Sequence, residues 1–396
     1  MSTRRLVTFI VLFLLANLAI VPAFAVGATG GPAAAPPTGT RVPVLAFYYI
    51  WFDAGSWDRA KIDYPAIGRY SSDDPTVIRE QIRSAKDAGI DGFIVSWKST
   101  PTNNRRLRLV MTIAAEEQFK LAMIYQGLDF SRQPLPVDRV AADFVLFRDT
   151  FADDPVFLRL NGKPLTIFSG TWAFDHDAVA AVTDPVRDSI LVLSSEKSVE
   201  GYQRLADVTD GDAYYWSSVD PETHPSYPDK LNAMSQAVHA DANIWIAPFS
   251  PGFDARLVGG TKTVERKDGQ TLITQFHTAE QSAPDALGLI SWNEFSENTY
   301  VEPSEQLGDR YLSVLRQLVQ TEAPDQPPIG DADLGDSSSS PSGTEIVTNT
   351  AMLIVFVGGL FGVVGFLARR RRRAESTLPE DRQDKSTRRS WANVLR

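Results

Sequence analysis

The chain has 396 residues, of which 43% are hydrophobic, so it is long enough to bury the core of one large domain or of two ordinary ones. Its 39 Lys and Arg against 49 Asp and Glu give a net charge of −10, the wrong sign for a protein that neutralises nucleic-acid phosphates. The absence of cysteine excludes disulfides, thiolate metal sites and Cys nucleophiles, and the four histidines are not spaced as a metal-binding pair. We therefore expect no nucleic acid, no metal and no cofactor, which leaves carboxylate and aromatic side chains as functional candidates.

The first 25 residues have the features of a secretory signal peptide. Two arginines precede an apolar run over residues 6–20, and Ala23-Phe24-Ala25 places small residues at the two positions that a signal peptidase inspects. We predict cleavage near Ala25, with an uncleaved N-terminal anchor as the alternative. Residues 26–40, dense in Gly, Pro and Ala, are predicted to be a linker.

The C-terminal region predicts a membrane anchor. Residues 351–368 form an uncharged stretch of 18 residues, and the five arginines 369–373 that follow favour a cytoplasmic tail over residues 369–396. Residues 321–350, rich in Pro, Gly, Ser and Asp, are predicted to be a disordered stalk. The expected location is the cell membrane, with one span and the N-terminal domain outside the cell. The exterior part without the signal peptide, stalk included, has a net charge of −18, which favours neutral or cationic ligands.

Between residues 41 and 320, predicted strands alternate with helical patterns. The apolar runs that predict strands lie at residues 44–49, 93–97, 121–125, 156–160, 165–168, 190–193, 244–248 and 287–292, and the helical patterns at 75–88, 104–118, 136–151 and 305–319. This alternation predicts an α/β fold, and at this length a (β/α)8 TIM barrel. An open doubly wound sheet is the alternative, but no Gly-x-Gly-x-x-Gly motif follows the first strand.

Aromatic and polar residues cluster where the predicted strands end, which is where a barrel of this kind carries its active site. Flat aromatic faces among carboxylates and amides suit a sugar ring, whereas packing within the barrel is the alternative role for each aromatic residue. The candidates for substrate binding are Tyr49, Trp51, Trp97, Tyr125, Tyr215, Trp216, Asn293, Tyr300 and Glu302.

Two glutamates, Glu294 and Glu297, directly follow the last predicted strand. If the segment turns helically, their Cβ atoms lie about 5–6 Å apart. Glycoside hydrolysis needs two such carboxyl groups, one protonated and one ionised, and close like charges push their pKa values apart. The pair is therefore the candidate catalytic site, with a solvated pair at a helix start as the alternative.

Four segments together resemble glycoside hydrolase family 99, the endo-α-mannosidase and endo-α-mannanase family. They read LAFYYIW (45–51), IGRYSSDDP (67–75), AGIDGFIVSW (88–97) and WNEFSE (292–297). The resemblance implies a (β/α)8 barrel and metal-free retaining hydrolysis within α-mannose-type glycans. It also implies that Glu294 is the base acting on the sugar 2-hydroxyl, that Glu297 is the acid and then the base, and that Glu302 matches a further glutamate of the family.

The segment around the second carboxylate departs from the family's usual Trp-His-Glu-Gly-Thr at three positions, Phe295, Ser296 and Asn298. Both carboxylates are retained, so we expect the chemistry to be kept and the substrate specificity to differ. We predict a surface-anchored, endo-acting hydrolase with an oligosaccharide or polysaccharide substrate. Two alternatives are a glycan-binding barrel without turnover and an α-glucanase of another family, such as family 71.

Overall fold

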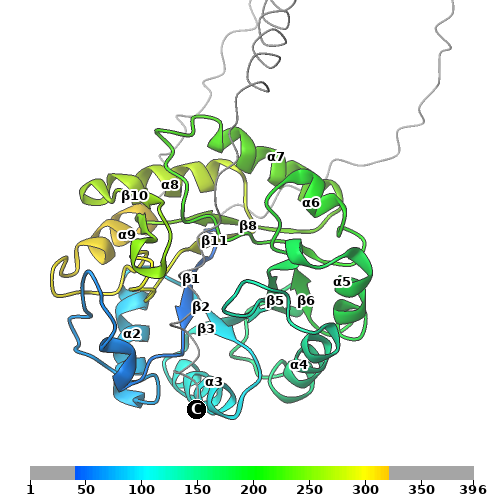
Figure 1. Cartoon of the computed structure of the whole chain (residues 1–396), viewed down its shortest axis with the longest axis horizontal. Coiled ribbons are helices and arrows are strands. Elements are labelled where there is room, and N and C mark those ends of the chain that lie inside the picture. The colour runs from blue at the N-terminus through cyan, green and yellow to red at the C-terminus, as the bar shows by residue number, and fades with distance from the viewer. Residues whose placement is uncertain (1–40, 321–396) are drawn as a thin grey trace, which may run out of the picture. The chain divides into compact units, whose positions relative to one another are not determined.

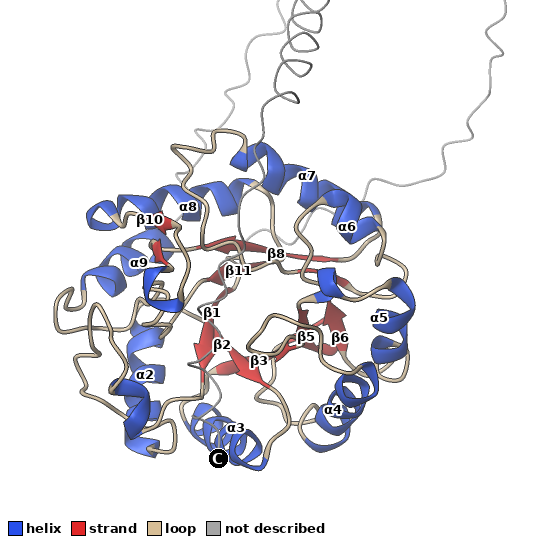
Figure 2. Cartoon of the chain, viewed as in Figure 1, coloured by secondary structure: helices blue, strands red, loops and turns tan. Residues whose placement is uncertain are grey.

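The computed structural model describes residues 41–320, which fold into an α/β barrel of the TIM type (Figure 1). Parallel strands form the inner wall of this part of the chain, and helices surround them (Figure 2). The parallel strands are β1 (Val44–Tyr49), β2 (Gly92–Trp97), β3 (Lys120–Gln126), β5 (Lys163–Ser169), β6 (Leu191–Leu193), β7 (Gly211–Asp212), β8 (Ile244–Phe249) and β11 (Ala286–Leu289). The helices are α2 (Pro75–Asp87), α3 (Pro101–Glu116), α4 (Val137–Thr150), α5 (His176–Thr183), α6 (Val199–Gln203), α7 (Tyr227–Ala240), α8 (Gln270–Gln281) and α9 (Arg310–Gln320).

The sheet closes through its shortest strands. Its order is β5-β3-β2-β1-β11-β8-β7, and β6 pairs with the other side of β5. A parallel bridge between Ser194 and Asp212 then joins the ends of β6 and β7, and the Ser194 N–H donates to the Gly211 carbonyl at 2.8 Å. Because all these strands run in one direction, their carboxyl ends lie together at one end of the barrel.

Short strands and 3-10 turns lie outside the parallel sheet. β4 (Arg159–Leu160) pairs antiparallel with the start of β5, and β9 (Phe253–Asp254) pairs antiparallel with β10 (Thr263–Val264) in the connection from β8 to α8. Single 3-10 turns occupy Ala54–Trp57, Thr171–Ala173, Arg256–Val258 and Lys267–Gly269.

The helix start and stop predicted from the sequence around α2 are confirmed. The Asp74 side chain accepts the N–H of Thr76 at 2.9 Å and caps the helix, and Pro75 occupies its first turn. Gly89 follows the helix with a φ of 86°, and a Cβ there would lie 2.6 Å from the Val319 side chain on α9. Only glycine satisfies both the left-handed backbone and the close approach of the two helices.

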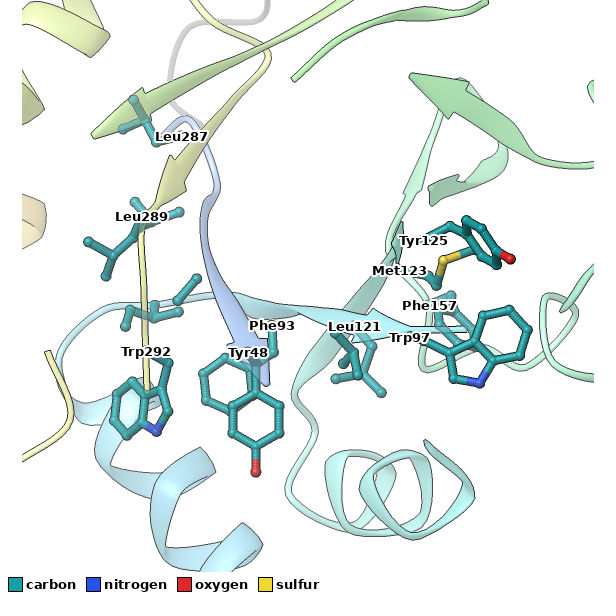
Figure 3. Packing of buried hydrophobic residues seen from close by; sticks show 14 of the residues in the cluster. Tyr48, Phe93, Trp97, Leu121, Met123, Tyr125, Phe157, Leu287, Leu289 and Trp292 are labelled. Atoms are coloured by element: carbon teal, nitrogen blue, oxygen red, sulfur yellow. The ribbon is translucent and has the colours of Figure 1, made fainter. Parts of the chain in front are cut away.

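Alternation along each strand separates two apolar layers. On β1, Val44, Ala46 and Tyr48 pack with helix residues, and the Tyr48 ring stacks on Phe93 at 4.5 Å in the layer drawn in Figure 3. The intervening residues of β1, including Phe47 and Tyr49, pack inside the barrel with other strand residues. Since successive side chains of a strand point to opposite faces, this parity decides which aromatic residues can reach the centre of the barrel.

The α/β prediction is confirmed, and seven of the predicted strands match β1, β2, β3, β5, β6, β8 and β11 within a few residues. The strand predicted at 156–160 is found only in part: Phe157 makes an isolated parallel bridge to Leu121 on β3, and Arg159–Leu160 forms the antiparallel β4. The predicted strand at 287–292 stops at Leu289, because the chain then turns into a long loop. Helices α5–α8 were not predicted. Nor was β7, because it has only two residues and no apolar run.

Several predicted segments lie outside the described residues. They are the signal peptide (1–25), the linker (26–40), the stalk (321–350), the transmembrane helix (351–368) and the basic tail (369–396). Within residues 41–320, no helix combines the length and apolar character that crossing a membrane requires.

Candidate active site

The loop after β11 folds back on itself and carries the two candidate glutamates. The Ser291 hydroxyl accepts the backbone N–H of Glu294 at 2.9 Å and is 2.9 Å from the Thr299 hydroxyl. The Thr299 N–H reaches the Glu294 carbonyl at 3.3 Å, which closes the turn around Glu297. The Asp254 N–H donates to the Glu297 carbonyl at 2.8 Å, so β9 fixes the far side of the loop.

Asn293 fastens this loop to the end of β1. Its Oδ1 accepts the backbone N–H of Tyr49 at 2.9 Å, and its Nδ2 donates to the Tyr49 carbonyl at 3.0 Å and to the Tyr70 hydroxyl at 3.2 Å. Asn293 is fully buried, and all of its polar atoms are engaged within the protein. It therefore positions Tyr49 and the neighbouring Glu294 instead of facing a ligand.

Glu294 is buried among groups that favour its ionised form. Burial raises the pKa of its carboxyl. The Ser296 N–H, which donates to Oε1 at 2.8 Å, the Ser296 hydroxyl and the charge of Lys61 act against that rise. These donors supply a local reason for Glu294 to carry the negative charge of the pair.

The carboxyl of Glu297 is also buried, but among the described residues no donor contacts it. Burial, followed by the neighbouring charge of Glu294, raises the pKa of Glu297 to about 7. Only the charge of Arg132 acts in the other direction. The pKa values of both carboxyls are thus raised, and only Glu294 has donors and a nearby cation that oppose the rise.

Two tyrosines stand beside the glutamates. The Tyr49 hydroxyl donates to the Tyr215 hydroxyl at 2.9 Å, and the Phe47 ring meets the Tyr215 ring edge-on at 5.0 Å. Burial, and then nearby groups that include both glutamates, raise the pKa of each phenol well above its usual value, so both are neutral hydrogen-bond donors. Trp51 lies against the Tyr49 ring at 4.3 Å and is 44% exposed, which leaves an indole face open to a ligand.

Glu302 lies in a separate buried network. It accepts the Tyr70 hydroxyl at 2.9 Å and the Gln81 amide at 2.7 Å, and the Gln81 carbonyl oxygen accepts the Tyr48 hydroxyl at 2.6 Å. Burial raises the pKa of Glu302 to about 8, against the effect of these two donors. A hollow of about 360 Å³ over α2 is lined by Gln81, Trp292 and Glu302 but not by the glutamate pair. Glu302 is thus linked to the site only through Tyr70 and Asn293.

The structure does not bring three of the predicted aromatic residues to this group. Trp97 and Tyr125 pack between the sheet and the helices (Figure 3), where the Trp97 indole donates to Asn104 at 3.0 Å and the Tyr125 hydroxyl donates to Asp143 at 2.9 Å. Trp216 packs in the same outer layer. For Trp97 and Tyr125 the physical reason is strand parity, because both side chains have the outward register on β2 and β3; Trp216 lies in the loop after β7.

Tyr300 also has a structural position. Its ring stacks on Phe295 at 4.0 Å, and its hydroxyl donates to the buried Asp63 at 2.7 Å. Behind it, Arg266 donates to the carbonyls of Asn298 and Tyr300 at 2.9 and 2.8 Å. Tyr300 therefore stabilises the loop that carries the glutamates.

Asn298 occupies a position that explains one departure from the family sequence. Its φ is 54°, in the left-handed region where glycine is the usual residue. Asn is among the side chains that tolerate this region best, so Asn298 can form a turn that a glycine would also accept.

Two cations and a tyrosine near the glutamates were not predicted from the sequence. Lys61 acts on Glu294, Arg132 acts on Glu297, and Tyr70 links Asn293 to Glu302. Both cations lie in irregular loops, where no sequence periodicity indicates which way a side chain points. Tyr70 lies in the 67–75 motif that supports the family resemblance. Within residues 41–320, no group of three or more His, Asp or Glu side chains has the arrangement of a metal site.

Paired carboxyl groups in different environments at the strand ends of a TIM-type barrel are typical of glycoside hydrolases. The family model for glycosyl hydrolase family 99 matches residues 51–313. The chain therefore belongs to glycosyl hydrolase family 99, as the sequence motifs indicated.

Its relatives include mammalian and bacterial proteins. The glycoprotein endo-alpha-1,2-mannosidase of Rattus norvegicus is 22% identical over 261 residues, 60% of this chain and 56% of the rat protein. The glycoprotein endo-alpha-1,2-mannosidase-like protein of Mus musculus is 22% identical over 268 residues, 60% of this chain and 57% of the mouse protein. The chain thus spans a little over half the length of these two relatives.

A solved structure supports the fold. The GH99 endo-alpha-mannosidase from Bacteroides thetaiotaomicron has a TM-score of 0.62 and 23% identity, over 71% of this chain and 97% of that one. At this identity the similarity establishes a common TIM-type fold.

Proposed function

We propose that the chain is an endo-acting, retaining glycoside hydrolase that cleaves α-mannose-type glycans, with Glu294 as base and Glu297 as acid and then base. The observation that carries the proposal is the difference between the two buried carboxyls: Glu297 has a pKa of about 7, whereas donors from Ser296 and the charge of Lys61 oppose the rise in the pKa of Glu294. Family membership and the activity for which the rat relative is named support the choice of an α-mannoside.

In the first step, the Glu294 carboxylate removes the proton of the sugar 2-hydroxyl as O2 attacks the anomeric carbon. The bond from that carbon to the leaving oxygen breaks, and Glu297 gives its proton to this oxygen. The product is a 1,2-anhydro sugar, with Glu294 protonated and Glu297 ionised.

In the second step, ionised Glu297 removes a proton from water, which attacks the anomeric carbon and opens the three-membered ring. The proton on Glu294 returns to O2, so both carboxyls regain their starting states. Two inversions at one carbon give net retention of configuration. The neutral Tyr215 hydroxyl, which accepts the hydrogen bond of Tyr49, can donate its own proton to a substrate oxygen beside the pair, and Trp51 offers a stacking face.

We also propose that the barrel is held at the cell surface, after removal of residues 1–25, by a span at residues 351–368. The support is the uncharged apolar run followed by five arginines. In intact cells, external protease should degrade the barrel and leave the tail protected, and alkaline carbonate should not extract the chain. Complete protection of the barrel from protease would contradict this proposal.

Hydrolysis is tested with the full-length chain and an α-mannan, by release of reducing ends. Glu297→Gln and Glu294→Gln should each lower kcat by about 100-fold or more, whereas Glu116→Gln, on the outer surface of α3, should leave it unchanged. If Glu297 acts as the acid, its loss should matter less for release of fluoride from an α-glycosyl fluoride, because fluoride leaves without protonation. Tight binding of mannan without any product would instead identify a non-catalytic glycan-binding barrel.

A further inference from the structure

A group of aromatic and cationic side chains extends outward from Glu297. Trp172 follows β5, Lys197 follows β6 and Tyr214 follows β7, so parallel strands bring all three to the same end of the barrel as the glutamates. The Trp172 and Tyr214 rings meet edge-on at 5.5 Å, and the Lys197 ammonium lies 4.5 Å from the centre of the Trp172 ring. We call this group, with Arg132 and Lys230, the cationic shelf.

The shelf continues on both sides of Tyr214. Trp216 contacts the Tyr214 ring at 4.9 Å, and the Lys230 ammonium lies 4.4 Å from the centre of the Trp216 ring. Burial, and then the charge of Lys197, lower the pKa of Lys230, which indicates that the two ammonium groups repel each other. On the opposite side, the charge of Arg132 acts on both Tyr214 and Glu297, so the shelf adjoins the proposed acid.

The cations of the shelf, Arg132, Lys197 and Lys230, form no ion pair within the described residues, although the charge of Lys197 acts on the neighbouring Glu196. The nearest carboxyls beneath Tyr214 are Glu196 and Asp212. Burial raises the pKa of both, and Glu196 already pairs with Arg204 at 3.3 Å. The shelf therefore presents net positive charge.

This local charge differs from that of the surrounding protein. Residues 41–320 contain 27 Lys and Arg against 39 Asp and Glu, so the described part of the chain carries net negative charge. Close unpaired cations repel one another, and holding them together is favourable when an anion lies between them. Aromatic rings between the cations add the apolar faces that a sugar ring stacks on.

We propose that the cationic shelf binds an anionic sugar unit of the substrate, one that carries a carboxylate or a phosphate or sulfate ester. The inference rests on the proposed function, because it names the substrate class for the same site. It revises the expectation of neutral or cationic ligands, which came from the average charge of the chain.

The test compares binding of three glycans to the full-length Glu297→Gln protein: a phosphate-bearing α-mannan, the same mannan after removal of phosphate, and α-mannan oxidised to uronate at C6. We expect the phosphate-bearing or the uronate form to bind at least tenfold more tightly than neutral mannan in 50 mM salt, with the advantage shrinking in 500 mM salt. Whichever anionic arm shows the advantage identifies the anionic group. Equal affinity for all three glycans would overturn the proposal.

Two double variants locate the effect. Lys197→Gln with Lys230→Gln should bring the affinity ratio of anionic to neutral mannan close to one. Lys120→Gln with Lys163→Gln removes the same charge from the starts of β3 and β5, at the opposite end of the barrel, and should leave the ratio unchanged. An unchanged ratio in the Lys197/Lys230 variant would contradict the shelf, and thermal melting of each variant checks that it is folded.

Hydrolysis by the unaltered chain separates this inference from the proposed function. Cleavage of neutral and anionic mannans at equal kcat/KM would retain the hydrolase and reject the shelf. Preferential binding of anionic mannan without cleavage of any glycan would retain the shelf and reject the hydrolase.

Discussion

Asn293 holds Tyr49 by both of its backbone groups, with hydrogen bonds of 2.9 Å from the Tyr49 N–H and 3.0 Å to its carbonyl. These groups lie where β1 ends and can no longer pair with a neighbouring strand. One amide side chain therefore replaces two ladder hydrogen bonds at the point where the barrel opens into the site. The phenol of Tyr49 and the carboxyl of Glu294 thus depend on the same residue for their positions.

Replacement of Asn293 should affect both stability and turnover. Asn293→Ala leaves two buried backbone groups without partners, each worth about 1–3 kcal/mol, so we expect the free energy of unfolding to fall by roughly 2–4 kcal/mol. We also expect kcat/KM to fall more than tenfold, because Tyr49 and Glu294 lose their common support. Urea unfolding and mannan hydrolysis measure the two effects. Asn232→Ala on α7 is the control, and equal stability of the two variants would contradict the assigned role.

The pH dependence should report Glu297. Its pKa is about 7, and the acid must be protonated, so kcat/KM should fall tenfold per pH unit above about pH 7. The charge of Arg132 lowers the pKa of Glu297, so Arg132→Gln should raise that pKa and move the falling limb a few tenths of a unit to higher pH. Arg139→Gln, one loop away on α4, should not move it. A shift to lower pH in Arg132→Gln would contradict this assignment.

The fold could be predicted from the sequence where an apolar run, a cap and a glycine coincide, as they do for β1 and for α2 between Asp74 and Gly89. β7 could not, because its two residues make a strand only through pairing with β8 and a bridge to Ser194. Partners distant in the sequence, and not local preference, determine such an element.

The candidate site was predicted in part for a similar reason. Glu294 and Glu297 are neighbours in the sequence, so spacing and motif placed them together. To place the aromatic residues, one must know which face of its strand each side chain occupies. On β2 and β3 the inward side chains near the site are Ser96 and Gln126, which share a 3.1 Å hydrogen bond, whereas Trp97 and Tyr125 point outward. Counting alternate residues from an apolar interior position such as Ile94 would have made this distinction.

Glu302 should make stability depend on pH. Its pKa rises from about 4.5 to about 8 on folding, so its contribution to stability is present below pH 4.5 and is lost as the pH rises through 8. Glu302→Gln removes this titration. Relative to the unaltered chain, the variant should gain a few kcal/mol between pH 5 and pH 9, at about 1.4 kcal/mol per pKa unit.

Urea unfolding at the two pH values measures this gain. The exposed Glu305→Gln serves as the control and should show no such change. If the unaltered chain and Glu302→Gln lose stability in parallel between pH 5 and pH 9, Glu302 does not titrate as described.

Trp51 and Trp97 were both predicted to bind substrate, but their replacement should have different effects on KM and on stability. Trp97→Phe removes buried volume and the hydrogen bond to Asn104, so the free energy of unfolding should fall by roughly 2 kcal/mol while KM for mannan stays within twofold. Trp51 is 44% exposed beside Tyr49, so Trp51→Ala should raise KM about tenfold through loss of a stacking face and change stability by less than about 1 kcal/mol. A large rise in KM for Trp97→Phe with unchanged stability would show that parity does not govern access to this site.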